Sequence, residues 1–264
     1  MPRCGSSPTM AWDPMDEATL SRDAFLGGRL QIWQPRRGYR AGVDPVLLAA
    51  SVPARTGQSV LELGCGVGVA SLCLAARVPG LALTGVEIQP DYADLARRNA
   101  CDMAAPFEVV TADLTALPAD LRQRRFDHVI ANPPYFLRDQ STPATDTGRE
   151  TALGERVSLA GWVEVAARRV VDGGYVTFIQ RAERLPELMA LMTARLGSVE
   201  VLPLTPRRGR PAQLVLIRGR KGGRAAFRLC DSVLMHEGAA HDGDRDSYTP
   251  LVGSVLRDGA GLPF

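Results

Sequence analysis

The sequence contains little cysteine, and its five cysteines are poorly spaced for cross-linking or metal binding. They are scattered and odd in number, without a CxxC pair or a cysteine–histidine ligand spacing. This pattern argues against a disulfide framework and against a zinc site. We therefore expect no bound metal and a reducing, cytoplasmic environment. The histidines are also few, and we expect surface or structural roles for His128, His236 and His241.

Long hydrophobic runs are absent as well. The N-terminal stretch has no apolar core of the kind that signal peptides carry, and no uninterrupted apolar run is long enough to span a bilayer. The formal net charge is only +2, so any basic surface for a nucleic acid must be local. Arginines do cluster, at residues 36–40, 122–125 and 207–224. We expect a soluble protein without a membrane partner, whose residues 1–24 form a loose segment.

Strand-like and helix-like patterns alternate through the middle of the chain. Short apolar runs separated by amphipathic stretches favour an α/β fold, with a mostly parallel sheet and helices on both faces. Two strand patterns, 199–206 and 212–221, follow one another without a helix, which predicts an antiparallel hairpin at one edge of the sheet. No repeat or linker divides the chain, so we expect one domain over 25–264, with a core at 55–220 and a C-terminal strand and tail at 221–264.

The segment 25–54, ahead of the core, is expected to form a hairpin or edge strand followed by a short helix. Gly27 and Gly28 mark the kink of the hairpin. Asp44 stands where a helix N-cap is expected, directly before a proline at the first helical position. A polar stretch at 137–156 is long for a loop in a compact domain, and such loops are usually either functional or mobile.

The turn after the first core strand reads VLELGCGVGVA, with glycines at 64, 66 and 68. Glycines at such a turn let the backbone approach a ligand closely at the carboxyl edge of a sheet. The dinucleotide fingerprint requires its third glycine at position 69, where this chain has Val69. The spacing, with the acidic Glu62 ahead of it, therefore favours a cofactor without a pyrophosphate and argues against an NAD-dependent oxidoreductase.

Polar side chains end the next three core strands, namely Glu87, Asp113 and Asn132. Because the carboxyl ends of parallel strands meet at one edge of a sheet, we expect these side chains to share a site with the glycine turn. Glu87 is placed to accept hydrogen bonds from both hydroxyls of a ribose. Asp113 either accepts from the amino group of an adenine or caps the helix that follows it.

This ordered series of strand-end residues and glycines resembles the class I S-adenosylmethionine-dependent methyltransferases, over about residues 55–220. The resemblance implies a Rossmann-like fold with a seven-stranded sheet, and S-adenosylmethionine as the cofactor. It also implies that the glycine turn passes the methionine moiety, with Glu62 near its amino group, Glu87 on the ribose and Asp113 on the adenine. The cofactor-binding residues so implied are Glu62, Gly64, Gly66, Gly68, Glu87, Asp113 and Asn132.

The stretch IANPPYF ends the fourth core strand, because neither Pro133 nor Pro134 can donate a ladder hydrogen bond. By themselves these residues also fit a stiff loop. Within the family, Asn-Pro-Pro-Tyr resembles the catalytic motif of enzymes that methylate a planar nitrogen. The resemblance implies that the Asn132 side-chain carbonyl and the Pro133 backbone carbonyl accept the two N–H bonds of the target. Pro134 then braces these acceptors, and Tyr135 stacks on the target.

The segment from about residue 24 and the tail YTPLVGSVLRDG resemble the bacterial tRNA adenine-N6 methyltransferases, which share a GxD-x-x-LLA segment before the glycine turn. Here that segment contains Gly42, Asp44, Leu47 and Leu48, and it departs from the family's common residues at Val43 and Pro45. The resemblance implies a tRNA partner and an adenine N6 target, with Asp44 in a segment that closes over the site. The expected RNA contacts are Arg36, Arg37, Arg40, Asp44, Arg207 and Arg208, since clustered arginines contact phosphates.

Two alternatives stay open. A glutamine methyltransferase acting on release factors uses the same Asn-Pro-Pro-Tyr chemistry, but it typically carries a separate N-terminal helical domain. The segment ahead of the glycine turn is short here and partly strand-like. A non-catalytic protein of this fold that only binds RNA or a partner is the second alternative, and the intact acidic and Asn-Pro-Pro-Tyr residues argue against it.

Overall fold

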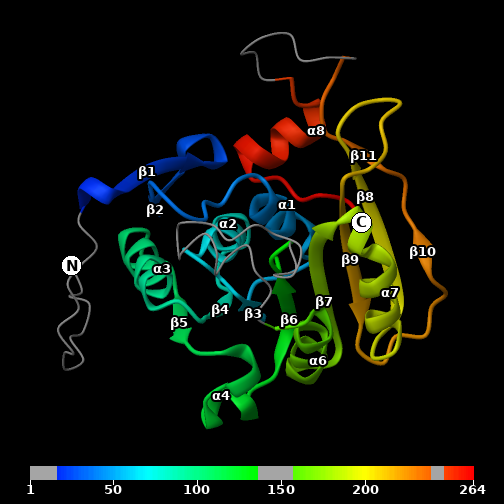
Figure 1. The fold of residues 1–264 in the computed structure, drawn as a ribbon, viewed down its shortest axis with the longest axis horizontal. Helices are drawn as coiled ribbons and strands as arrows, with labels where there is room; N and C mark the ends of the chain where they lie inside the picture. Colours follow the sequence, from blue (N-terminus) through cyan, green and yellow to red (C-terminus); the bar gives the residue numbers. More distant parts are fainter. Residues whose placement is uncertain (1–16, 136–156, 239–246) are drawn as a thin grey trace.

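A computed structural model describes residues 17–135, 157–238 and 247–264, and one sheet runs through its centre (Figure 1). The strands of this sheet are β3 (Ser59–Leu63), β4 (Ala82–Glu87), β5 (Phe107–Thr111), β6 (Phe126–Ala131), β7 (Val170–Arg181), β8 (Gly197–Thr205), β9 (Leu214–Arg220), β10 (Arg228–Leu229) and β11 (Val233–Leu234). Their order across the sheet is β10-β8-β9-β7-β6-β3-β4-β5, and β11 also pairs with β8.

The directions of the strands confirm the expected fold class. β9 runs antiparallel to both β7 and β8, and the other pairs in the sheet are parallel. Seven longer strands therefore form a Rossmann-like sheet that contains one antiparallel hairpin. The hairpin does not form the edge, however, because the two-residue strands β10 and β11 pair along the outer side of β8.

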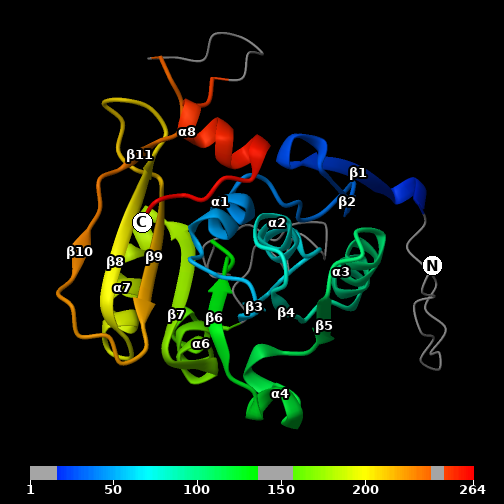
Figure 2. The same ribbon diagram turned by 180° about the vertical axis from the view of Figure 1, so that it is seen from behind.

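Helices cover both faces of the sheet (Figures 1 and 2). One face carries α1 (Asp44–Ser51), α2 (Val69–Arg77) and α3 (Pro90–Asp102), and the other carries α4 (Ala119–Gln123), α6 (Leu159–Arg169) and α7 (Leu185–Thr193). Neighbouring residues of a strand point to opposite faces, so Val60 joins the first buried cluster and Leu61 the second.

Short helical turns complete the described chain. They are η1 (Glu17–Thr19), η2 (Leu26–Gly28), η3 (Leu114–Ala116), η5 (Ala182–Arg184), α8 (Pro250–Gly253) and the π-helical η6 (Ser254–Asp258). None of the helices in the described ranges has the length and apolar character needed to cross a membrane.

The N-terminal hairpin forms as expected, but it begins earlier. β1 (Leu20–Phe25) pairs antiparallel with β2 (Leu30–Pro35), and the turn between them contains Gly27 and Gly28. The expected boundary at residue 24 is therefore wrong for the residues from Leu20 onward. Leu20 lies opposite Pro35 and is buried in the core, so the start of β1 is held by packing. Residues 1–16 lie outside the described ranges.

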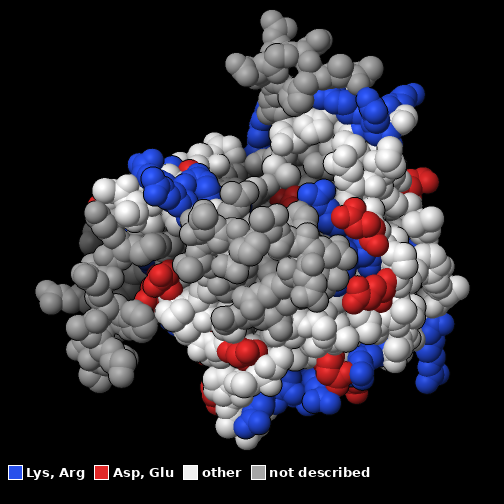
Figure 3. All heavy atoms as spheres, in the orientation of Figure 1, with Lys and Arg blue, Asp and Glu red and all other residues white. Residues whose placement is uncertain are grey.

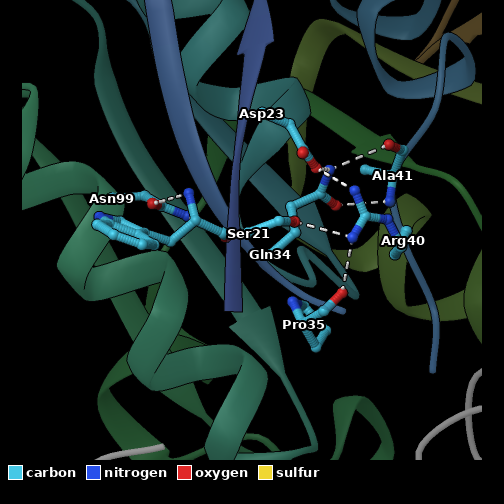
Figure 4. Close-up of polar contacts among 8 residues, drawn as sticks. Ser21, Asp23, Gln34, Pro35, Arg40, Ala41 and Asn99 are labelled. Carbon is cyan, nitrogen blue, oxygen red and sulfur yellow. Dashed lines mark hydrogen bonds and ion pairs between the residues drawn. The ribbon is translucent and has the colours of Figure 1, made fainter. Parts of the chain in front are cut away.

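One buried amide joins this hairpin to the glycine turn. Asn99 of α3 is fully buried, and its Oδ1 accepts a hydrogen bond from the backbone N–H of Trp33 in β2 at 2.8 Å (Figure 4). Its Nδ2 donates to the carbonyl oxygen of Trp33 at 3.1 Å and to that of Val67 at 3.0 Å. The hairpin is thus fixed against the turn that follows β3.

Candidate active site

A cavity of about 470 Å³ lies at the carboxyl edge of β3, β4 and β6, a size typical of a cofactor or small-molecule site. The neighbours of β3 are β4 on one side and β6 on the other, so the cavity lies at the switch point where α/β sheets bind ligands. The predicted site residues that line it are Arg40, Asp44, Glu62, Gly64, Gly66, Glu87, Asp113, Asn132, Pro133, Pro134 and Tyr135. The structure therefore brings most of the predicted set together, but it places Gly68, Arg36, Arg37, Arg207 and Arg208 outside the cavity wall.

The three glycines of the turn have different environments, although each has a positive φ. A Cβ at Gly66 would meet only the ring of Tyr39, at 4.0 Å, so the cavity comes close to the backbone there. A Cβ at Gly64 would lie 2.5 Å from the indole of Trp162. A Cβ at Gly68 would lie 2.8 Å from the ring of Phe107, so that glycine serves packing rather than ligand approach.

Glu62 at the end of β3 is 3% exposed and lines the cavity. Its Oε2 accepts hydrogen bonds from the backbone N–H of Ser71, at 3.0 Å, and from the Ser71 hydroxyl. Burial raises the pKa of Glu62 to about 8, against the lowering effect of these two uncharged donors. A cationic group in the cavity would favour the ionised form of Glu62, and the ammonium of a bound methionine moiety is such a group.

Glu87 at the end of β4 holds the glycine turn. Its Oε2 accepts from the backbone N–H of Gly66 and its Oε1 from that of Gln89, both at 2.9 Å. Burial raises the pKa of Glu87 above its usual value, while these backbone bonds lower it. Glu87 also lines the cavity, and its predicted contact to ribose hydroxyls stays a prediction.

Asp113 follows β5 and acts as a helix cap. Its Oδ1 accepts from the backbone N–H of Thr115 at 2.8 Å and from the Thr115 hydroxyl at 2.7 Å, which caps η3. The capping alternative considered for this residue is therefore correct. Asp113 also lines the cavity, so the predicted adenine contact stays a prediction.

The expected role of Asp44 as an N-cap is wrong. Asp44 is the first residue of α1, and the preceding cap position, Val43, makes no side-chain cap bond. The carboxylate instead accepts a hydrogen bond from the hydroxyl of Tyr135. Burial, together with the negative charge of Asp44, raises the pKa of the Tyr135 hydroxyl above its ordinary value. The bond links the segment 25–54, which precedes the core, to the Asn-Pro-Pro-Tyr segment.

Four residues that the sequence did not single out also shape the site. The guanidinium of Arg181 lies 5.3 Å from the centre of the Tyr135 ring, and Gln180 contacts the Pro133 carbonyl. Tyr39 and Trp162 line the cavity on either side of the glycine turn. No local pattern marks these positions, because each reaches the site through contacts that are distant in the chain.

Two of the arginines proposed to contact RNA are held by their own chain. Arg40 forms an ion pair with Asp23 at 2.6 Å and donates to the Ser21 hydroxyl at 2.8 Å and to the Pro35 carbonyl at 3.1 Å (Figure 4). Arg207 donates to the carbonyl oxygens of Glu237 and Gly238 and to the Ser247 hydroxyl. The Arg40 guanidinium thus stabilises the β1–β2 hairpin, and the Arg207 guanidinium stabilises the chain near residues 237 and 247.

The remaining arginines of that set lie on the surface. Arg36, Arg37 and Arg208 are exposed, and Arg36 Nε donates to the carbonyl oxygen of Ala18 at 3.1 Å. Basic side chains gather over the β1–β2 hairpin and over the β8–β9 turn (Figure 3). The β8–β9 turn lies at the same end of the sheet as the carboxyl end of β6, because β7 is parallel to β6 and β9 runs antiparallel to both β7 and β8.

The histidines take no part in the cavity wall among the described residues. His128 is 2% exposed within β6, and its Nε2 lies 3.0 Å from Oε1 of Gln58. His236 stacks on Tyr248 and contacts the hydroxyl of Ser247. The expected structural role is confirmed for both. His241 and the predicted loop at 137–156 lie outside the described ranges. In those ranges, no group of three or more histidine, cysteine or acidic side chains is arranged to hold a metal ion.

Residues 41–203 match the family model described as the methyltransferase small domain. The tRNA1(Val) (adenine(37)-N6)-methyltransferase of Porphyromonas gingivalis is 32% identical over 205 residues, which cover 70% of this chain and 77% of that protein. The enzyme of the same name from Actinobacillus succinogenes is 30% identical over 203 residues, which cover 74% of this chain and 82% of its own.

Solved structures agree with the fold. The crystal structure of a predicted O-methyltransferase from Agrobacterium tumefaciens superimposes with a TM-score of 0.68 and 28% identity, covering 83% of this chain and 98% of the other. A 16S rRNA methyltransferase of T. thermophilus, in complex with AdoMet and guanosine, gives a TM-score of 0.53 at 19% identity, covering 76% of this chain and 50% of the other. The second likeness shows the fold alone.

Proposed function

Because this chain belongs to the methyltransferase small domain family, we propose that it transfers the methyl group of S-adenosylmethionine to the N6 amino group of an adenine in tRNA. The single observation that carries the proposal is the Asn132-Pro-Pro-Tyr segment at the rim of a cavity whose other walls are Glu62, Glu87 and the glycine turn. The names of the relatives, which are tRNA adenine-N6 methyltransferases, support the same substrate. A tRNA substrate also supports a cytoplasmic location.

The cofactor supplies an electrophilic methyl group on a sulfonium when it is bound. In the proposed site, Glu62 holds the ammonium of the methionine moiety, and the backbone at Gly66 allows close approach. Glu87 accepts from the ribose hydroxyls, and Asp113 contacts the adenine ring of the cofactor. Together these residues would hold the cofactor in the cavity that Asn132 also lines.

The chain's own acceptors then prepare the target nitrogen. Its lone pair is delocalised into the adenine ring, which makes it a weak nucleophile. The side-chain carbonyl of Asn132 and the backbone carbonyl of Pro133 accept its two N–H bonds and favour a pyramidal nitrogen whose lone pair points at the methyl group. Tyr135 stacks on the extruded base, and its ring is held by the bond to Asp44. In the transfer, the nitrogen would form a bond to the methyl carbon as the carbon–sulfur bond breaks and leaves a neutral thioether, and the methylated nitrogen would then lose one proton to water and become neutral and planar.

The acceptor pair favours an amino group over a hydroxyl. A target hydroxyl has one hydrogen to donate, whereas Asn132 and Pro133, which both line the cavity, supply two carbonyl acceptors in the proposed mechanism. An amide nitrogen of glutamine satisfies the pair equally well, so the relatives' names rather than the cavity favour adenine. For RNA binding, Arg36, Arg37 and Arg208 are the proposed phosphate contacts, because Arg40 and Arg207 each contact three groups of their own chain, whereas the exposed Arg36 donates to one, the carbonyl oxygen of Ala18.

The test is transfer of a labelled methyl group to total tRNA and, in parallel, to a purified peptide-release factor. We expect label in tRNA, recovered as N6-methyladenosine after nuclease digestion. The Asn132→Ala variant should lose transfer by roughly 100-fold or more while it still binds the cofactor in a thermal-shift assay. Label that appears only in the release factor would refute the tRNA assignment. A protein that neither binds cofactor nor transfers label would refute the enzyme assignment.

A further inference from the structure

The direction of the Pro133 carbonyl is not fixed by the proline ring. The ring sets φ near −65°, and Pro134 after it restricts ψ of Pro133 to the extended region, but within that region the carbonyl can still turn by a few tens of degrees, roughly from +120° to +160° in ψ. In the proposed function this carbonyl accepts one N–H bond of the target amino group, so its direction matters for transfer. A hydrogen bond from a second group would narrow the range that Pro134 leaves, and the inference that follows depends on that proposed function.

The register of the sheet brings Gln180 to Pro133. The last pair between the parallel strands β6 and β7 is Ala131 with Phe178. Pro133 and Gln180 each lie two residues beyond that pair, so they are neighbours across the two strands. Since a proline cannot donate a ladder bond, the backbone pairing stops, and a side chain takes its place. Nε2 of Gln180 donates to the Pro133 carbonyl oxygen at 3.5 Å. This is a long hydrogen bond, of the kind that often tightens only when the substrate is bound.

The other end of the Gln180 amide is held as well. Its Oε1 accepts the backbone N–H of Arg181 at 2.8 Å, which fixes which end of the amide faces Pro133. The side chain is fully buried, so water does not compete for either bond. A buried amide with one end unpaired would be costly, and the arrangement therefore favours keeping the donor on the carbonyl.

We propose that Gln180 is a positioning residue that aims the Pro133 carbonyl at the target amino group. A carbonyl oxygen has two lone pairs. One accepts from Gln180 inside the protein, and the other is left for the N–H of the target on the cavity side, where Pro133 lines the wall. The two N–H donors, one from the protein and one from the substrate, thus share the same oxygen.

Gln180→Glu is the sharpest test, because it keeps the acceptor for the Arg181 N–H and removes only the donor. When the buried carboxyl is ionised it cannot donate to Pro133; when it is protonated its O–H can replace the amide. Burial raises the pKa of such a carboxyl, so protonation occurs as the pH is lowered through the mildly acidic range. We expect the single-turnover methyl-transfer rate of Gln180→Glu to be about 10- to 100-fold below wild type at high pH and to approach wild type as the pH falls.

Two further variants separate positioning from folding. Gln180→Met lacks the donor at every pH, so its rate deficit should not depend on pH, while its cofactor affinity and its KM for tRNA should stay within about threefold of wild type. Thr177→Val is the matched control, because Thr177 lies on the same strand, is 1% exposed, and its hydroxyl has no partner among the described residues. Its rate should equal that of wild type.

The outcomes are distinguishable. A wild-type rate in Gln180→Met, or a deficit in Gln180→Glu that does not change with pH, would overturn the positioning role. A loss of cofactor binding in Gln180→Glu and Gln180→Met equal to the loss of transfer would also overturn it, since that result indicates a structural role. If wild type itself fails to methylate tRNA, the proposed function fails before the role of Gln180 is addressed.

Discussion

Cofactor affinity should depend on pH through the protonation of Glu62. The pKa of this buried carboxyl is raised to about 8 in the protein without ligand, so it is mostly protonated at neutral pH. Binding of the methionine ammonium favours the ionised form, which lowers the pKa in the complex. The protein must therefore release a proton when it binds the cofactor, and binding should tighten as the pH rises toward 8.

The size of the effect follows from the cost of ionising Glu62. With a pKa of about 8, that cost is about 2 kcal/mol at about pH 6.5 and about 0.8 kcal/mol at about pH 7.5, since one pH unit corresponds to about 1.4 kcal/mol. The difference is roughly an eightfold gain in affinity over that interval. The cofactor's α-amino group has a pKa of about 7.8, so part of it is already uncharged at the higher pH, which reduces the net gain in affinity to roughly fivefold.

Isothermal titration in two buffers of different ionisation enthalpy measures both quantities, the affinity and the number of protons released. We expect nearly one proton released per protein at about pH 7. Glu62→Gln, which keeps an oxygen acceptor for the Ser71 N–H, should bind more weakly at the higher pH and release no proton from this site. An affinity in wild type that changes less than twofold over the interval, without proton release, would refute the pairing of Glu62 with the ammonium.

Three further results are expected. Gly68→Ala should lower the free energy of unfolding by about 1–3 kcal/mol in denaturant titrations, because φ of Gly68 is +88° and the added Cβ would meet the ring of Phe107. Cofactor affinity should not change, because both residues lie outside the cavity wall. A loss of affinity without a loss of stability would contradict this. Burial lowers the pKa of His128 to about 4, so the folded state binds fewer protons than the unfolded state, and stability should fall by about 3 kcal/mol as the pH drops from about 6.5 to about 4. His128→Gln should flatten that part of the curve, and an unchanged curve would show that another group titrates. Arg208→Ala should weaken tRNA binding and reduce its salt dependence, whereas Arg224→Ala, the same charge change at the opposite end of β9, should do neither.

The sequence predicts the strand-end residues well because their placement follows from periodicity alone. Glu62, Glu87, Asp113 and Asn132 each lie within two residues of the carboxyl end of a parallel strand, and the topology then brings those ends to one edge. The seven longer strands, including the antiparallel pair β8 and β9, follow from the same alternation of patterns. Such features depend on short stretches of chain, which a sequence displays directly.

The errors concern residues whose partners are far away in the chain. Asp44 reads as a helix cap because the residue after it is a proline, yet its carboxylate binds Tyr135, 91 positions later. Gly68 belongs to an evenly spaced triplet, but the ring of Phe107 determines its role. Leu20 precedes the expected hairpin because its pairing with Pro35 and its burial depend on tertiary packing. These tertiary contacts cannot be predicted from the local propensities of the residues.

The amide of Asn99 sets a practical limit on how far the chain can be shortened. The family match starts at residue 41, which invites expression of a fragment that begins there. Such a fragment would lack Trp33 and leave Asn99 with one of its three hydrogen bonds, the one to Val67, at a site that was fully buried. Removal of the hairpin would therefore loosen the support of the glycine turn as well. We therefore expect the smallest folded catalytic unit of this protein to include β1 and β2.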